Sequence, residues 1–523
     1  MRAWLVAFAL MAASCANAPS PPPGTDADTV AWWNMTGDLS SDAMEGRETG
    51  SAGYDRAADY VEARFRAAGL KPAGENDGYR QTLPLKEVRV EKAGTSFEIF
   101  TNLGGTLPDG RVRLAEARVN LDFLHDISVR PTTELPGLIQ APMAFRGYCS
   151  PEAMGDVKGR VVICFGTRRA GMTTAGQRLE AAAKAGAVGI INVDDPGFTI
   201  EPARWPDAYA RSITFRDAGP PAYPKLAVMR ASTDAFSAFL TWTDQDAEAI
   251  LKAGAASQPL PSFDVGSWLI AHFAISQREL QSDNILALLP GTDPDLKDQI
   301  VIVSAHLDGY GYGEPVNGDA LYNGAFDDAA YVATLIRLAE RQAGEGFKRS
   351  VLFAVYTGEE KGLLGSNWFA SHLTVPKEKI AAVVNLDQLR PLFPLKVLTM
   401  HAVGDTTLAA NVGRVAAAMG IEVRPDREPE RNLNQRTDHW PFLRMGVPAT
   451  NFVFGFDPGT DAEVKYREWY TTRYHRPQDD MSQPLDWGAA RDMNLFFYRL
   501  VEDVANDPAR PMFLPSSQWA PRN

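Results

Sequence analysis

Long apolar runs and amphipathic segments alternate along the second half of the chain. From about residue 280 onward, runs such as QIVIVSAHLD, SVLFAVYTG and IAAVVNLDQL are almost continuously apolar. Between and after them lie segments with apolar residues at helical spacing, over 328–341, 361–373, 406–419 and about 487–506. Strands that are apolar throughout are buried on both faces. The pattern predicts an α/β fold with three layers, in which helices cover both sides of a mixed, mostly parallel sheet.

The first half of the chain has a different pattern of apolar and polar residues. Residues 30–72 predict helices with polar turns between them, and the clearest helix, DRAADYVEARFRAAGLKP, stops at Gly69 and Pro72. Within 121–274, VKGRVVICFG predicts a strand, and TAGQRLEAAAKAGAVGIINVDD predicts a helix followed by another strand. This β–α–β fragment indicates a small separate domain.

The first 18 residues predict an export signal. One Arg precedes a short apolar run, Ala3–Ala13, which is too short to span a bilayer. Two processing sites compete: Ala16-Asn17-Ala18 fits cleavage after small residues, whereas Ala-Ser-Cys15 resembles a lipoprotein box and is favoured. Residues 19–29 are rich in proline and predict a flexible tether. No later stretch is long and apolar enough for a membrane helix.

Composition narrows the class of protein. The chain has 523 residues, 45% hydrophobic and 22% charged, which is ordinary globular material. Its net charge of -13 argues against nucleic acid as a partner. We expect an exported protein that is periplasmic, anchored to the outer membrane by a lipid on Cys15, or secreted. Of the three cysteines, Cys149 and Cys164 would then remain, either as a disulfide or as two thiols, and both alternatives stay open.

Acidic side chains and a histidine stand where apolar runs end or a helix begins. The residues concerned are His306, Asp308, Asp327, Asp328, Glu359 and Glu360. In α/β sheets, sites form outside the carboxyl ends of the strands. Charges that converge there are too costly to bury without a partner. The pattern therefore predicts a metal site.

Two zinc ions that share a carboxylate need nitrogen and oxygen ligands. The chain offers such a set in His306, Asp327, Glu360, Asp387 and His475. Glu359 is adjacent to a predicted ligand and is free to move protons, and Asp308 is placed to orient His306. Each motif alone is weak, because EE pairs are usually solvated and DD pairs commonly form turns or helix caps. Their joint occurrence within one α/β region strengthens the interpretation.

The motifs together resemble those of the di-zinc aminopeptidase family of metallopeptidases (family twenty-eight), which also holds glutamate carboxypeptidase and glutaminyl cyclase. AHLD is similar to the first metal-binding strand, YNGAFDDAA to the bridging-ligand motif, and TGEEKGLLGS to the Glu-Glu-x-Gly-Leu-x-Gly-Ser motif. NLDQ, TDHWPFLRMGVPA and YHRPQDD follow in the family's order. SSDAMEGRETGSAGYDRAADYVEARFRAAGLKP is similar to the family's opening segment.

The resemblance implies the zinc exopeptidase fold and a division of the chain. Residues 30–120 would form the N-terminal part of the peptidase domain, and 275–510 would form the catalytic domain. The segment 121–274, with VKGRVVICF and AAAKAGAVGIINV, resembles an inserted protease-associated domain.

The resemblance also implies roles for the site residues. His306 and Asp387 would hold one zinc ion, Glu360 and His475 the other, with Asp327 as the bridge. Glu359 would be general base and acid, and Tyr474 would help to polarise the scissile carbonyl. Asp308, Asp328 and Asp438 would support the ligands, with a cis bond between Asp327 and Asp328.

The chain departs from the family pattern at three places. Tyr331 follows the bridging motif where relatives often have a small residue, NLDQLR replaces NLDM-x-Gly, and Thr437 stands where Ser is commoner. None of these changes removes a ligand or the base. The second change alters a wall expected near the substrate.

The resemblance favours an exported aminopeptidase that acts on peptides with two zinc ions. A carboxypeptidase or dipeptidase on the same core is an alternative, because Arg390, Arg436 and Arg473 lie near the motifs and could hold a terminal carboxylate. Glutaminyl cyclisation is a weaker alternative, since metal ligation alone does not distinguish this activity from peptide hydrolysis. A non-catalytic binding protein that retains the fold belongs to a different class. Loss of ligands would mark it, and here every predicted ligand and the base are present.

Overall fold

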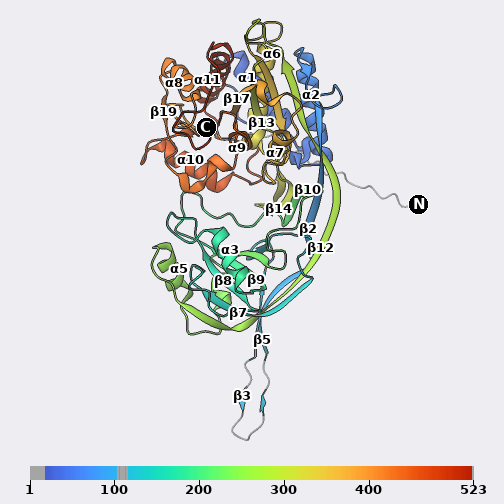
Figure 1. Cartoon of the computed structure of the whole chain (residues 1–523). Helices are drawn as coiled ribbons and strands as arrows, with labels where there is room; N and C mark the ends of the chain where they lie inside the picture. The colour runs from blue at the N-terminus through green and yellow to red at the C-terminus, as the bar shows by residue number, and fades with distance from the viewer. Residues whose placement is uncertain (1–17, 103–104, 107–111, 114–115, 521–523) are drawn as a thin grey trace, which may run out of the picture. The chain divides into compact units, whose positions relative to one another are not determined.

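The computed structural model describes residues 18–102, 105–106, 112–113 and 116–520, which form two compact units (Figure 1). The first unit takes in the chain up to Leu83, Ser282–Asp426, and everything from Asn434 onward. The second unit consists of Pro84–Gln281 and Arg427–Leu433. The predicted signal segment and Cys15 lie outside the described residues. Within the described residues, no helix combines the length and apolar character needed to cross a bilayer.

The first unit is built on a sheet with the strand order β20-β17-β13-β16-β12. These strands are β20 (Ala449–Thr450), β17 (Ile380–Asn385), β13 (Ile300–His306), β16 (Ser350–Tyr356) and β12 (Ser262–Leu289). β13 pairs in parallel with β16 and β17, and β17 pairs in parallel with β20. β12 pairs antiparallel with β16 and with the short β1 (Lys71–Pro72). The predicted mixed, mostly parallel sheet is confirmed.

Helices cover both faces of this sheet. Leu352 and Ala354 of β16 pack in one cluster with Phe369 of α7 (Leu364–Ser371) and Phe442 of α9 (Trp440–Arg444). Phe353 between them points to the opposite face, because side chains alternate along a strand. There its ring centroid lies 5.6 Å from that of Phe65 in α2 (Ala52–Ala67). The three layers therefore follow from strands that are apolar on both faces.

The helices on the Phe353 face are α1 (Ala27–Leu39), α2 (Ala52–Ala67), α6 (Ala330–Arg341) and α11 (Trp487–Asn506). α6 contacts β13 directly, and α1 packs on α6 and α11. The first turns of α1 and α2 are fixed by side-chain caps: Asp26 accepts from the Thr29 amide, and Ser51 accepts from the Tyr54 amide. The unit also contains α8 (Leu408–Ala418), α10 (Asp461–Thr472) and a small sheet of β18 (Val397–Met400), β19 (Glu422–Arg424) and β21 (Phe452–Gly455).

The second unit has its own sheet and core. The amino-terminal part of β12 continues into the order β7-β8-β9-β11-β6, with β7 (Leu138–Arg146), β8 (Val161–Gly166), β9 (Gly189–Asp194), β11 (Ala227–Ala231) and β6 (Ile127–Val129). Helix α3 (Ala175–Lys184) joins β8 to β9, as the β–α–β pattern predicts. Helices α4 (Phe236–Phe239) and α5 (Ala247–Ala255) complete it. Cys149 and Cys164 form a disulfide, which settles the alternative left open by the sequence.

The second unit is larger than the segment 121–274 that the sequence analysis sets apart. It begins at Pro84 and ends at Gln281, inside the long strands β2 (Arg80–Asn102) and β12. Both strands alternate buried and exposed side chains over much of their length, so neither shows a break in pattern at the boundary. β2 also pairs with β5 (Glu116–Leu121) and β10 (Arg211–Phe215), which draws the preceding residues into this unit.

Candidate active site

The candidate metal ligands lie at the carboxyl ends of the parallel strands of the first unit. β13 ends at His306, β16 leads through a short turn to Glu359 and Glu360, and β17 leads to Asp387. Because these strands are parallel neighbours, their carboxyl ends meet at one edge of the sheet. The sequence therefore brings four functional side chains together simply by ending three buried strands in polar residues.

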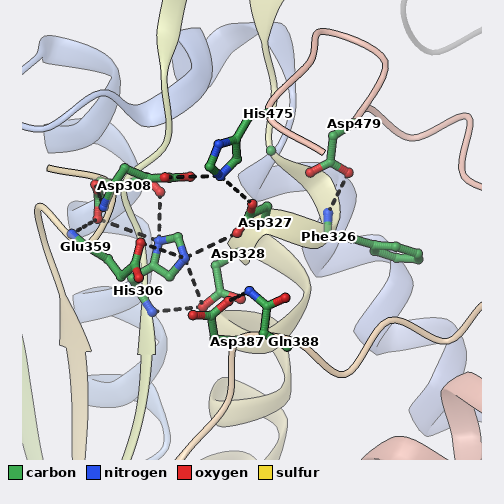
Figure 2. A network of polar contacts seen from close by, with 12 residues as sticks. His306, Asp308, Phe326, Asp327, Asp328, Glu359, Asp387, Gln388, His475 and Asp479 are labelled. Atoms are coloured by element: carbon green, nitrogen blue, oxygen red, sulfur yellow. Dashed lines mark hydrogen bonds and ion pairs between the residues drawn. The ribbon is translucent and has the colours of Figure 1, made fainter. Parts of the chain in front are cut away.

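Asp327 and His475 reach this edge from outside the sheet. Asp327 lies in the turn Ala325–Ala329 that precedes α6, and His475 follows α10. Asp327 Oδ1 is 3.4 Å from His306 Nε2, and its Oδ2 is 3.3 Å from His475 Nε2 (Figure 2). His475 Nε2 is also 3.2 Å from Glu360 Oε2. One carboxylate thus faces two histidines, one with each oxygen.

The site contains two groups of side chains that could each hold a metal ion. The first group is His306, Asp328 and Asp387, and the second is Asp327, Glu360 and His475. Within each group the donor atoms lie within 4.8 Å of one another. Asp328, which we expected only to support the ligands, is close enough to belong to the first group. The Asp327–Asp328 peptide bond is cis, as the resemblance implies.

The residues fit a metal ion chemically. His306 Nε2, Asp327 Oδ2 and Asp328 Oδ1 are buried atoms without a hydrogen-bond partner. Buried polar atoms in this state are costly unless a ligand satisfies them. A mixed set of imidazole nitrogens and carboxylate oxygens is the set that zinc prefers.

The ring of His306 is oriented by the strand end itself. Its Nδ1 lies 3.0 Å from the backbone carbonyl oxygen of Asp308, whereas the Asp308 carboxylate is farther away, at 3.7 Å. The Asp308 carboxylate instead accepts hydrogen bonds from the backbone amides of Glu359 and Glu360, at 3.0 and 3.3 Å, and from the Thr49 hydroxyl. Asp308 thus positions three site residues, through its carbonyl and its carboxylate.

Tyr310 plays the corresponding part for His475. Its hydroxyl oxygen lies 2.9 Å from His475 Nδ1, and the two ring centroids are 4.6 Å apart. A histidine that binds metal through Nε2 carries its proton on Nδ1 and donates it to such a partner. Tyr310 precedes a hairpin of β14 (Gly311–Val316) and β15 (Asp319–Tyr322).

We expect Tyr310→Phe to weaken binding of the second metal ion about 10-fold, because His475 loses the acceptor that fixes its ring. Competition with a chromophoric chelator measures this affinity. Tyr312→Phe is the matched control, since Tyr312 lies in the same hairpin and is 59% exposed. Equal affinity in Tyr310→Phe and Tyr312→Phe would contradict the assigned role.

The turn that carries Asp327 is held by Asp479. The backbone amide of Phe326 donates to Asp479 Oδ1 at 3.0 Å (Figure 2). The amide of Ala325 donates to the Asp479 carbonyl at 2.8 Å. Gln483 donates to the same carboxylate oxygen at 2.6 Å. Burial, together with the nearby Asp327 charge, raises the pKa of Asp479 to about 7. Its other oxygen, Oδ2, has no hydrogen-bond partner.

This raised pKa predicts a pH effect on stability. In the metal-free protein the folded state holds a proton on Asp479 between pH 4 and 7 that the unfolded chain releases, so stability falls as pH rises through this window. Asp479→Asn keeps the Oδ1 acceptor and removes the charge. We expect it to raise the thermal midpoint at pH 8 by a few degrees and to change it little at pH 5. Equal shifts at both pH values, or none, would contradict this explanation.

The protonation of the remaining groups suits acid–base chemistry. Burial raises the pKa of Glu359 well above its usual value, although the nearby His306 opposes the shift. Burial raises the pKa of Asp387 to about 6 and that of Asp438 to about 7. Burial alone would also raise the pKa of Asp327, but the two histidines that face its oxygens hold this pKa well below the usual range.

Tyr474 lies against the second group of ligands. Its ring centroid is 3.8 Å from that of His475 and 4.8 Å from that of Tyr470. Burial raises the pKa of Tyr474 well above its usual value, so its hydroxyl stays protonated and can donate a hydrogen bond. Glu359 reaches the first group, with Oε2 4.0 Å from His306 Nε2.

All residues selected from the sequence thus fall in the first unit, but several that shape the site were missed. Asp479 lies in the motif YHRPQDD, but the sequence assigned no role to it or to Tyr310. Arg47 lies in a segment whose composition is typical of a surface loop. Arg47 is fully buried and donates to the carbonyl oxygens of Leu307 and Gly324, at 2.7 and 2.8 Å. The only available signal was the similarity of its segment to the family's opening.

Comparison with known proteins agrees with this geometry. The model of peptidase family M28 matches residues 284–501. A probable leucine aminopeptidase 2 of Aspergillus oryzae is 23% identical over 289 residues, which are 52% of this chain and 53% of that protein. The chain spans about half the length of the curated relatives it matches first.

Two solved structures share the fold over nearly their full length. The aminopeptidase from Aneurinibacillus sp. strain AM-1 has a TM-score of 0.60 at 18% identity, covering 95% of this chain and 98% of that one. BSAP, a zinc aminopeptidase from Bacillus subtilis, has a TM-score of 0.54 at 16% identity, covering 92% and 96%. At these identities the likeness establishes the fold.

Proposed function

Because residues 284–501 form a domain of peptidase family M28, we propose that this chain is a di-zinc aminopeptidase, which hydrolyses the peptide bond next to a free amino terminus. The observation that carries the proposal is the position of Asp327, whose two oxygens face two different histidines. A carboxylate in that position can bridge two ions. Matched relatives and fold neighbours that are named as aminopeptidases support the same activity.

The residues that would hold the ions divide as the resemblance implies. His306 and Asp387 would hold one zinc ion, Glu360 and His475 the other, and Asp327 both. When bound, the ions would supply Lewis-acid polarisation of the scissile carbonyl and lower the pKa of the attacking water.

The protein's own residues would handle the protons. Glu359, with its raised pKa, would accept a proton from the attacking water and pass it to the departing amine nitrogen. Tyr474 would donate a hydrogen bond to the oxygen on which negative charge develops. Asp308 would hold Glu359 in place through the bond from the Glu359 amide.

The surroundings of the site favour an amino terminus over a carboxylate. Glu359 is partly exposed beside the candidate ligands, and its carboxylate would attract a cationic amine. Arg390, a candidate for binding a terminal carboxylate, is 1% exposed and is enclosed by aromatic rings, so it is not presented to a substrate. This weakens the carboxypeptidase alternative.

We propose as well that the protein is exported and carries a lipid on Cys15, and that the second unit is a protease-associated domain. The Cys149–Cys164 disulfide supports an oxidising compartment. The β8–α3–β9 arrangement supports the domain assignment.

A panel of peptides tests the activity. We expect peptides with a free amino terminus, including C-amidated ones, to be shortened from that end, and N-blocked peptides to resist. We also expect about two zinc ions per chain and loss of turnover with a chelator, restored by added zinc. Cleavage of N-blocked peptides would refute the aminopeptidase assignment, and full activity in chelator would refute the metal centre.

A further inference from the structure

The segment NLDQLR places two polar side chains beside the metal ligands, where the sequence departs from the family pattern. Gln388 is 3% exposed and Arg390 is 1% exposed. Gln388 Nε2 donates to Asp387 Oδ1 at 2.5 Å (Figure 2), and Gln388 Oε1 accepts from Arg390 Nη1. The two side chains are therefore joined to each other and to one candidate ligand.

Tyr470 closes this arrangement. Its hydroxyl accepts from Arg390 Nη1 at 2.9 Å and donates to Gln388 Oε1. The three side chains form a ring of hydrogen bonds that is buried from solvent, since Tyr470 is 3% exposed. A buried ring in which the partners satisfy one another restricts each side chain to one rotamer.

Arg390 extends from this ring toward the bridging carboxylate. Its Nη2 lies 3.8 Å from Asp327 Oδ2, and neither Nη2 nor Nε has a hydrogen-bond partner. A buried guanidinium is costly without a compensating charge, and Asp327 supplies one. The rings of Trp469, Tyr470 and Tyr474 surround the cation, with centroids 4.1, 5.0 and 5.1 Å from its central carbon.

Tyr331, which departs from the family pattern after the bridging motif, lies within the electrostatic influence of Arg390. It is fully buried, burial raises the pKa of its hydroxyl, and the Arg390 charge opposes that shift. Two departures that are separate in sequence thus interact electrostatically. A path of contacts then runs from Asp387 through Gln388 and Arg390 to Asp327.

We propose that Gln388, Arg390 and Tyr470 form a positioning unit that fixes Asp387 and Asp327 in the orientation needed to bind metal ions. This inference rests on the proposed function, because it assigns a task within that site. The three residues act through the ligands and do not touch the substrate. Arg390 stabilises the arrangement by placing a cation beside Asp327.

The test compares zinc affinity and turnover in Arg390→Met, Gln388→Leu and the double variant. Each single change should raise the zinc dissociation constant about 10- to 100-fold. Chelator competition on the metal-free protein measures this constant. At saturating zinc, kcat should fall about 10-fold or more while KM changes less than about 3-fold. The double variant should lose little more than the worse single variant, because the residues act as one unit.

Controls separate this role from general damage. Arg414→Met removes the same charge from a half-exposed surface pair with Asp503 and should leave zinc affinity and turnover unchanged. Arg390→Lys keeps the charge but cannot contact Gln388, Tyr470 and Asp327 together, so it should recover only part of the loss. If Arg390→Met does not fold, as judged by circular dichroism, Gln388→Leu and Tyr470→Phe provide the same comparison.

The measurements distinguish a failure of the proposed function from a failure of the positioning unit. Wild-type protein that binds no zinc or cleaves no peptide would refute the proposed function. Wild-type activity together with variants whose zinc affinity and kcat stay within about 2-fold would refute the positioning unit alone. Losses that multiply in the double variant would show that the residues act independently, and would also overturn it.

Discussion

We expect Glu359→Gln to lower kcat about 10²- to 10⁴-fold while the zinc content of the protein stays at its wild-type value. Glutamine has nearly the same shape, and the backbone amide of residue 359 still donates to Asp308, so the turn keeps its position. The amide side chain cannot take a proton from water. Because Glu359 is not a predicted ligand, the loss should fall on turnover and leave metal binding intact.

Steady-state kinetics on a free-amino-terminus peptide, with metal analysis of the same samples, measure both effects. Glu345→Gln is the control, since Glu345 is exposed and lies beyond the end of α6. Its kinetic constants should match those of the wild type. Turnover within 10-fold of wild type in Glu359→Gln would mean that another group moves the proton. Loss of zinc in Glu359→Gln would mean that the residue is a ligand.

The strands that carry the site could be predicted because their pattern is local. β13, β16 and β17 are buried at every position, and a strand buried on both faces appears in the sequence as an uninterrupted apolar run. β2 and β12 could not be located with the same certainty. They are long, and their side chains alternate between buried and exposed positions. Each strand runs from one compact unit into the other, and no change in composition marks the boundary.

The ligands could be predicted for a similar reason, whereas the residues that position them could not. His306 ends a buried strand, and Glu360 and Asp387 come shortly after the ends of two others. Asp479 and Tyr310 act through contacts with residues that are 153 and 165 positions away. A single carboxylate or phenol carries no local signal of such a partner, because the contact arises only when the fold brings the two segments together.

Arg47 also acts through contacts with residues that are far away in the sequence, such as Leu307. Its guanidinium donates to four backbone carbonyl oxygens, those of Leu39, Leu307, Asn323 and Gly324, at 2.7–2.8 Å. Burial lowers the pKa of Arg47 to about 10, so the side chain stays charged at neutral pH. It thereby ties α1, the end of β13 and the chain leading into the Asp327 turn to one point.

We expect Arg47→Met to destabilise the metal-free protein by about 3–5 kcal/mol, because four carbonyls lose their donor inside a dry core. Gly324 is closely packed in this turn, since a Cβ added there would lie 2.4 Å from the Asp327 carbonyl oxygen. Zinc affinity should also fall, since the turn that carries Asp327 is no longer held.

Guanidinium chloride unfolding of the metal-free protein measures the stability change, and chelator competition measures the affinity. Arg56→Met is the matched control, because Arg56 is an exposed arginine that pairs with Glu45 and donates to a single backbone carbonyl, that of Ala43. Exposed pairs contribute about 1 kcal/mol or less. Arg47→Lys should recover only a minor part, since one ammonium cannot reach four carbonyls in a planar fork. If Arg47→Met were no less stable than Arg56→Met, the four hydrogen bonds would have no net effect on folding. The Asp327 turn would then have to be held by other contacts, such as those made by Asp479.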